Sequence, residues 1–320
     1  MDENTTRLVS SLDINEINTL LSLYYSREGF IKNFDGFDEE VLHNLVEKNL
    51  INASLGTGED TVSLTEYGLS ACGSVMVDII NVNKDLFRSK VQELPQRAVS
   101  SLINRVMWRD VISKETGVID PITKPYALDE SLWYERVLLK DERLEKMLEK
   151  IYDILEGVGF INTLEGQRWC SPEVENFLKG EYKEIMDLTW AEEDSLKYYY
   201  FFYVYAQDQK NLINFSGDGE EYRSMFFGDD SGPSDFWFSS NRSDPRSLLS
   251  SLGISESRIM GFLGEMQGEE IVNERYYPLS SFSFFSDEDK IFVISDIKSF
   301  MSYITSKFLT PVVDSLLKIS

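Results

Sequence analysis

Leu45-Val-Glu-Lys-Asn-Leu-Ile-Asn52 is the stretch that decides the fold, because the chain repeats its pattern twice more. The second copy is Leu155-Glu-Gly-Val-Gly-Phe-Ile-Asn162, and the third is Met266-Gln-Gly-Glu-Glu-Ile-Val-Asn273. Each copy has the pattern of a helix end, a tight polar turn, two apolar residues and an asparagine. The final asparagines are 110 and 111 residues apart. This spacing predicts a helix–turn–strand unit that occurs three times, although eight positions per copy leave both duplication and coincidence open.

Around the first copy, the sequence predicts two helices and a β-hairpin. Asp13, with Glu16 three residues later, forms a capping-box pattern, so a helix is expected to begin there and to end at Gly29. A second helix is expected from Asp38 to Asn49. Residues 56–60 have turn composition and separate two short strands. The apolar residues expected to face inward are Ile14, Ile17, Leu20, Leu21 and Tyr24 in the first helix, and Val41, Leu42, Leu45 and Val46 in the second.

A family resemblance follows from these residues. The run Leu45-Val-Glu-Lys-Asn-Leu-Ile51, a glycine-rich turn and Val62-Ser-Leu-Thr-Glu-Tyr-Gly68 resemble the recognition-helix end and wing of MarR-type and related archaeal winged-helix regulators. The resemblance covers residues 10–75 and recurs more weakly near 128–178 and 243–290. It implies tandem winged-helix units with helical connectors, in a mainly α fold with short β-hairpins (α+β). Winged helices serve as DNA readers and also as protein-docking modules.

Changes in composition along the chain predict three domains. The first spans residues 1–114 and adds a helical extension over 73–113 to its winged-helix unit. A linker over 117–125 leads to the second domain, residues 126–240, and the third covers residues 241–320. The elements expected in the later domains are helices over 128–139 and 141–155, strands at 160–161 and 168–170, a helix starting at 171–174, strands at 271–272 and 282–285, and a C-terminal helix over 296–317 interrupted at Pro311.

The second domain ends in an aromatic-rich insertion. Tyr198-Tyr-Tyr-Phe-Phe-Tyr-Val-Tyr205 is expected to be a helix that continues from Glu192, with a buried strand as the alternative. Core packing or a subunit interface is favoured over a ligand cage. Two further strands are possible at 222–227 and 236–238. For the C-terminal helix, packing on its own domain and pairing with a second copy are equally open.

Net charge limits the choice of partners. The formal charge is −24, and this negative field opposes binding to a phosphate backbone. The helix expected at 38–48 opens with Asp38-Glu-Glu40, whereas contacts to phosphates and bases require Arg, Lys, Asn or Gln. One basic island stands out, with Arg88, Lys90, Arg97, Arg105 and Arg109 as the possible interaction surface. These residues either contact an acidic partner or neutralise the chain's own acids, and the second role is favoured.

The sequence offers no convincing catalytic, cofactor or metal site. His43 is the only histidine, and Cys72 and Cys170 have no neighbouring base that would activate a thiol, so both are expected to be buried. The best group of candidate metal ligands comprises Asp218, Glu220, Glu221, Asp229, Asp230 and Asp235, but its spacing does not fit an EF-hand loop. No signal peptide or membrane span is expected, so the protein is expected to be cytoplasmic, with reduced thiols.

We therefore expect a non-enzymatic regulatory or scaffold protein that uses tandem winged-helix units for protein–protein interaction, with a protein partner or self-association. The alternative is a dimeric winged-helix transcriptional regulator that binds DNA. An enzyme or ligand-binding domain in residues 198–240 is the least favoured hypothesis.

Overall fold

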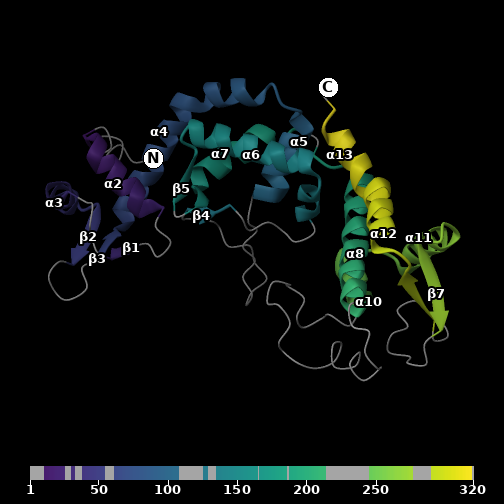
Figure 1. The fold of residues 1–320 in the computed structure, drawn as a ribbon. Coiled ribbons are helices and arrows are strands. Elements are labelled where there is room, and N and C mark those ends of the chain that lie inside the picture. Colours follow the sequence, from purple (N-terminus) through teal and green to yellow (C-terminus); the bar gives the residue numbers. More distant parts are fainter. Residues whose placement is uncertain are drawn as a thin grey trace. The chain divides into compact units, whose positions relative to one another are not determined.

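The computed structural model describes residues 11–25, 30–32, 38–54, 61–107, 125–128, 135–164, 166–185, 187–213, 245–276 and 290–318 (Figure 1). The chain divides into two compact units. Unit 1 consists of Met1–Arg136, Glu142–Asp187 and Leu317–Ser320, and unit 2 consists of Val137–Asp141 and Leu188–Leu316. The described part is mainly helical with small antiparallel sheets, which agrees with the α+β expectation. The domain boundaries expected near residues 114–126 and 240 stay predictions.

The first part of unit 1 contains the first copy of the repeat. Its elements are α2 (Ile14–Tyr24), β1 (Phe30–Lys32), α3 (Glu39–Glu47), β2 (Ile51–Ser54), β3 (Thr61–Leu64) and α4 (Glu66–Val91). The three strands form an antiparallel sheet in the order β1-β3-β2, in which Ile51 lies opposite Leu64. Helix α2 begins with the expected capping box, because Asp13 accepts from the Glu16 N–H at 2.9 Å and Glu16 accepts from the Asp13 N–H at 3.0 Å.

The rest of unit 1 contains the second copy. Its elements are α5 (Gln96–Ser101), the π-helical turn η1 (Leu102–Met107), β4 (Tyr126–Ala127), α6 (Glu142–Gly157), β5 (Ile161–Leu164), β6 (Gln167–Cys170) and α7 (Pro172–Tyr182). A 3₁₀ turn, η2 (Glu135–Lys140), precedes α6. The sheet order β4-β6-β5 matches that of the first copy, with the last strand of the hairpin in the centre.

Unit 2 contains the third copy. Its elements are α8 (Trp190–Ile213), α10 (Pro245–Leu252), α11 (Glu256–Gly268), β7 (Val272–Tyr276), β8 (Lys290–Ile294), α12 (Ile297–Ile304), the π-helical turn η4 (Thr305–Leu309) and α13 (Thr310–Leu316). Strands β7 and β8 form an antiparallel pair in which Val272 lies opposite Ile294. The aromatic run is helical, as expected, and α12, η4 and α13 pack along α8 (Figure 1).

The repeated sequence corresponds to a repeated turn. Asn49, Gly159 and Glu270 occupy equivalent positions and adopt the left-handed conformation, with φ of 58°, 75° and 61°. In each copy the next residue donates its N–H to a carbonyl five residues earlier, as in Leu50 to Leu45 at 2.9 Å, and the other two bonds are also 2.9 Å long. This is the Schellman termination of a helix, which redirects the chain directly into the following strand.

The exit from each hairpin is repeated as well. A side chain one or two residues after the second strand caps the next helix. Thr65 accepts from the Gly68 N–H at 2.9 Å, Ser171 from the Val174 N–H at 3.3 Å, and Asp296 from the Ser299 N–H at 2.7 Å. The structure therefore shows the same sequence of helix, left-handed turn, hairpin and capped helix three times. Whether each copy is a winged-helix unit stays a prediction.

Each unit has its own aromatic core. In unit 1, the rings of Phe87, Phe160 and Phe177 pack with centroid distances of 5.4 to 6.1 Å and join the two copies. In unit 2, Phe202 stacks on Phe308 at 5.8 Å and meets Phe300 edge-on at 6.0 Å. The aromatic run of α8 thus forms core, and the C-terminal helices pack against their own unit.

Several helix expectations need correction. Helix α2 ends at Tyr24, before Gly29. Ile14 is 67% exposed, because it occupies the first position of α2, ahead of the packed turns. Val46 is 41% exposed. At 100° per residue, Val46 lies about 90° around α3 from the centre of the face that Val41, Leu42 and Leu45 bury.

The C-terminal helix is continuous across Pro311. Pro311 has no N–H to donate to the carbonyl of Lys307, and the π-helical turn η4 widens the helix just before it. The expected interruption is therefore a change of helix type.

The strands were predicted less completely. Strands β1 and β4 were not expected, and neither was β8, which pairs with β7. Leu128 follows β4 in a turn and does not begin a helix. The strands expected at 222–227, 236–238 and 282–285 lie outside the described residues.

Candidate interaction surfaces

Arg88 in the basic island is engaged by the chain's own acids. Its guanidinium forms a two-pronged contact with Glu181 on α7, with Nε to Oε2 at 2.7 Å and Nη2 to Oε1 at 2.6 Å. Its Nη1 also donates to Asp85 at 3.1 Å. The hydrogen bonds from Arg88 to Glu181 raise the pKa of the guanidinium above that of an ordinary arginine. Such a fork-to-fork contact ties α4 to α7 with defined geometry.

Asp187, the last residue of the Glu142–Asp187 segment of unit 1, binds two more arginines of the basic island. Arg105 Nε donates to its Oδ2 at 2.7 Å, and Arg97 Nη2 donates to its backbone oxygen at 2.8 Å. The buried hydroxyl of Ser101 donates to its other carboxylate oxygen. All three donors come from α5 and η1, so this cluster fixes the chain at the point where it leaves unit 1.

The structure therefore does not present the predicted interaction surface as one basic patch. Arg88, Arg97 and Arg105 bind chain acids or carbonyls, Lys90 is exposed on α4, and Arg109 lies outside the described residues. This arrangement agrees with the favoured role, neutralisation of the chain's own acids. Partner binding by these residues stays a prediction.

The outer face of α3 is acidic. Asp38, Glu39 and Glu40 are exposed at the start of this helix, and α3 itself contains no Lys or Arg. His43 is exposed and lies 3.2 Å from Glu47 in the last turn. Lys48, directly after the helix, is turned inward and pairs with buried Glu16 at 2.5 Å. The face thus combines carboxylates with exposed Val46.

The two thiols lie in a buried joint between the copies in unit 1. Cys72 and Cys170 are both fully buried, as expected. Burial, with a smaller contribution from the nearby Glu173 carboxylate, raises the pKa of Cys72 far above that of a reactive thiol. The Tyr24 hydroxyl donates to Glu173 at 3.1 Å, and burial raises the pKa of that tyrosine as well. The raised pKa values keep the Cys72 thiol and the Tyr24 phenol neutral, so neither group is suited to act as a nucleophile.

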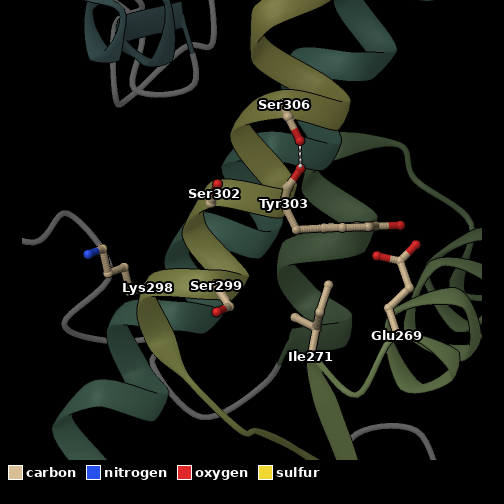
Figure 2. A pocket seen from close by; sticks show the side chains of 7 residues that line it. All are labelled: Glu269, Ile271, Lys298, Ser299, Ser302, Tyr303 and Ser306. Carbon is tan, nitrogen blue, oxygen red and sulfur yellow. Dashed lines mark hydrogen bonds between the residues drawn. The ribbon is translucent and has the colours of Figure 1, made fainter.

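Unit 2 carries a shallow groove of about 560 Å³ between the end of α11 and the face of α12 (Figure 2). Its lining consists of Glu269, Ile271, Lys298, Ser299, Ser302, Tyr303 and Ser306. In Figure 2, Tyr303 extends from α12 towards the side where Ile271 and Glu269 lie, while Lys298 lies at the opposite end. The groove is therefore lined mostly by polar groups, which come from the chain just after α11 and from one face of α12 and η4.

The polar groups in and beside the groove form hydrogen bonds within and between the helices that carry them. Lys307 donates to the Tyr303 hydroxyl at 2.9 Å, and that hydroxyl donates to Glu265 at 3.3 Å. Burial raises the pKa of Tyr303, so the phenol is neutral and is a poor general base. The Ser306 hydroxyl donates to the Tyr303 carbonyl at 2.9 Å within the same helix. These contacts connect α11 to α12 and η4 and do not form a catalytic constellation.

The remaining candidate features are the acid cluster, metal sites and membrane-spanning helices. The acid cluster from Asp218 to Asp235 lies outside the described residues. Within the described part, no group of three or more His, Cys, Asp or Glu side chains is placed to hold a metal ion. No described helix combines the length and apolarity that a membrane crossing requires.

Sequence reasoning missed two exposed apolar features. Val82 and Leu86 on α4 are 80% and 47% exposed, and Trp190 at the start of α8 is 88% exposed. A helical wheel of residues 66–91 would not have found the first pair, because at 100° per residue both lie on the side of α4 that carries the buried residues Ala71 and Val75.

Comparison of the chain with protein-family models, with curated proteins and with solved structures gave no match. Residues and geometry alone therefore support the functional assignment.

Proposed function

We propose that the protein is a non-enzymatic regulatory or scaffold protein whose three copies are winged-helix units used for protein–protein interaction. Support for the winged-helix assignment comes from the sequence resemblance. The helix, left-handed turn, hairpin and capped helix found in each copy are compatible with it. The third strand in the first two sheets, β1 or β4, is compatible as well.

One observation carries the choice of protein over DNA, namely the acidic outer face of α3. In helix-turn-helix proteins the N-terminal residues of the second helix contact base edges in the major groove. Asp38, Glu39 and Glu40 stand at that end of α3. Their carboxylates have no proton to donate to a phosphate oxygen, and their charge repels the backbone. Arg88 and Arg105, whose positive charges would offset this repulsion, are held by Glu181 and Asp187.

The test is binding of the full chain to random duplex DNA in a salt series from about 25 mM to about 300 mM, a range in which phosphate contacts dominate affinity. We expect no binding at the lowest salt. Micromolar or tighter binding that weakens steeply with salt would refute the proposal and favour the dimeric transcriptional regulator.

A second measurement tests the positive part of the proposal. Proteins captured by the wild-type chain are compared with those captured by a Glu40→Lys and Val46→Glu double variant. Both replaced side chains are at the surface of α3, so the fold is expected to persist. A partner that binds through α3 is lost from the variant and retained by a Glu93→Lys control, which changes an exposed acid outside α3.

A further inference from the structure

Helix α4 presents an exposed ridge that has no partner within the described structure. Asp78, Val82, Leu86 and Lys90 follow each other at intervals of four residues, and all four are exposed. The two apolar members are 80% and 47% exposed. Helices α2, α6 and α7 all pack on α4 within unit 1, and Figure 1 shows α4 along the outer edge of that unit. Asp78, Val82 and Leu86 therefore lie on a side of the helix that its neighbours leave open, while Lys90 lies at its edge, where a Cβ added at Gly157 of α6 would be 3.8 Å from its Nζ.

The ridge is complementary to a second copy of itself that runs antiparallel. From its N-terminal end the ridge consists of an acid, two apolar residues and a base, so the antiparallel copy places a base opposite each acid. Val82 then meets Leu86 of the other chain, and Asp78 meets Lys90. Asp78 and Lys90 form no ion pair with another described residue. Ridges formed at intervals of four residues are also those that interdigitate in the commonest class of helix packing.

The remaining charges near the ridge do not oppose this pairing. Asp85 lies beside the middle of the ridge, but Arg88 neutralises it at 3.1 Å. Lys84 lies about 160° around α4 from both Val82 and Leu86, and its Nζ donates to Asn81 at 3.4 Å. Shifting the register by three residues would place Asp78 opposite Glu93, so opposite charges favour the register centred near residue 84.

We propose that α4 forms the interface of a homodimer in which the two ridges pair antiparallel across a two-fold axis. Such an axis brings the same patch of both chains together, as an isologous contact requires. One helix face is smaller than the roughly 800 Å² per partner of a standard interface, so the dimer is expected to dissociate on dilution. The pairing does not depend on what α3 binds.

The first experiment is sedimentation equilibrium of the full chain from about 1 μM to about 1 mM, where interfaces of this size associate. We expect a monomer–dimer equilibrium. A Val82→Asp variant is expected to remain monomeric, because it places a charge in the centre of the contact. Ile14→Asp changes another exposed apolar residue of unit 1, outside α3 and α4, and is expected to dimerise as the wild type does.

Charge exchange then tests the register. Asp78→Lys alone and Lys90→Asp alone each place like charges in contact twice per dimer, and each is expected to weaken dimerisation by about tenfold or more. The double variant restores both pairs and is expected to recover wild-type association. A mixture of the two single variants is expected to form heterodimers.

Two results would overturn the proposal. The first is a wild-type chain that stays monomeric up to the highest concentration. The second is a dimer that is unaffected by Val82→Asp or is not recovered in the double charge exchange. Circular dichroism of each variant confirms that helix content is unchanged.

Discussion

At the scale of single residues, a close backbone contact explains why a glycine follows the first hairpin. A Cβ atom added at Gly68 would lie 2.0 Å from the carbonyl oxygen of Leu50, which is too close for any side chain. The Gly68 N–H is also the group that Thr65 caps at 2.9 Å. The glycine thus allows the start of α4 to approach the end of the left-handed turn.

Gly68→Ala is therefore expected to lower the free energy of unfolding of unit 1 by about 3 kcal/mol, because backbone atoms must move apart. Gly180→Ala is the matched control in the same unit. Gly180 lies inside α7, and a Cβ there meets nothing within 4 Å, so alanine is expected to stabilise by about 0.5 to 1 kcal/mol. Chemical denaturation of the two variants measures both effects. Equal destabilisation would contradict the contact at Leu50.

The repeated left-handed position allows a reciprocal exchange. Glu270 holds φ at 61°, and Gly159 holds φ at 75°. Glu270→Gly is expected to stabilise unit 2 by about 1 kcal/mol, because glycine adopts this conformation without strain, and Gly159→Glu is expected to destabilise unit 1 by a similar amount. Thermal unfolding of each variant provides the measurement. Two shifts of the same sign would show that the turns are not equivalent.

At the scale of elements, the cluster around Asp187 holds α5 and η1 in place. Arg105 and Asp187 have side chains that are only 21% and 20% exposed. Asp187→Asn is expected to destabilise unit 1 by about 2 kcal/mol, because it removes the charge that a partly buried guanidinium faces. Asp85→Asn is the control, since its carboxylate is 84% exposed and also faces an arginine. That exposed pair is expected to contribute much less to stability, because solvent screens it. Urea unfolding compares the two, and similar losses would mean that the cluster is not a structural anchor.

The elements also show what the sequence could predict. The helix ends at Asn49, Gly159 and Glu270 depend on neighbouring residues, so a local pattern was enough to find them. The same holds for Thr65 and Ser171, which cap the helix that follows each hairpin. Strands β1 and β4 have only three and two residues, too few to show an alternating pattern, and they are defined by pairing with distant strands.

The candidate surfaces were less predictable for a related reason. The basic island was visible in the sequence, but its partners Glu181 and Asp187 lie 82 to 93 residues away. No local pattern indicates which acid an arginine meets at such a separation. The exposure of Val82 likewise depends on where α6 and α7 pack, and it therefore needs the tertiary structure.

At the scale of the whole molecule, a net charge of −24 and an acidic α3 make the same prediction about DNA, so the two causes must be separated. Replacing Glu39, Glu40 and Glu47 by lysine reverses the face of α3 and leaves a net charge of −18. Replacing Glu93, Asp153 and Glu184 by lysine gives the same net charge through exposed acids on other elements.

If α3 belongs to a winged helix whose charge alone prevents DNA binding, only the first variant is expected to gain affinity for duplex DNA. Each new phosphate contact should add about 0.9 to the slope of log affinity against log salt, so a slope near 3 is expected. Fluorescence anisotropy across a salt series measures it. Equal binding by both variants would show that the net charge of the whole chain, and not the charge of α3, controls affinity for DNA. Binding by neither would mean that the surface around α3 lacks the shape to fit a groove, which would remove the main reason for comparing this chain with DNA-binding proteins.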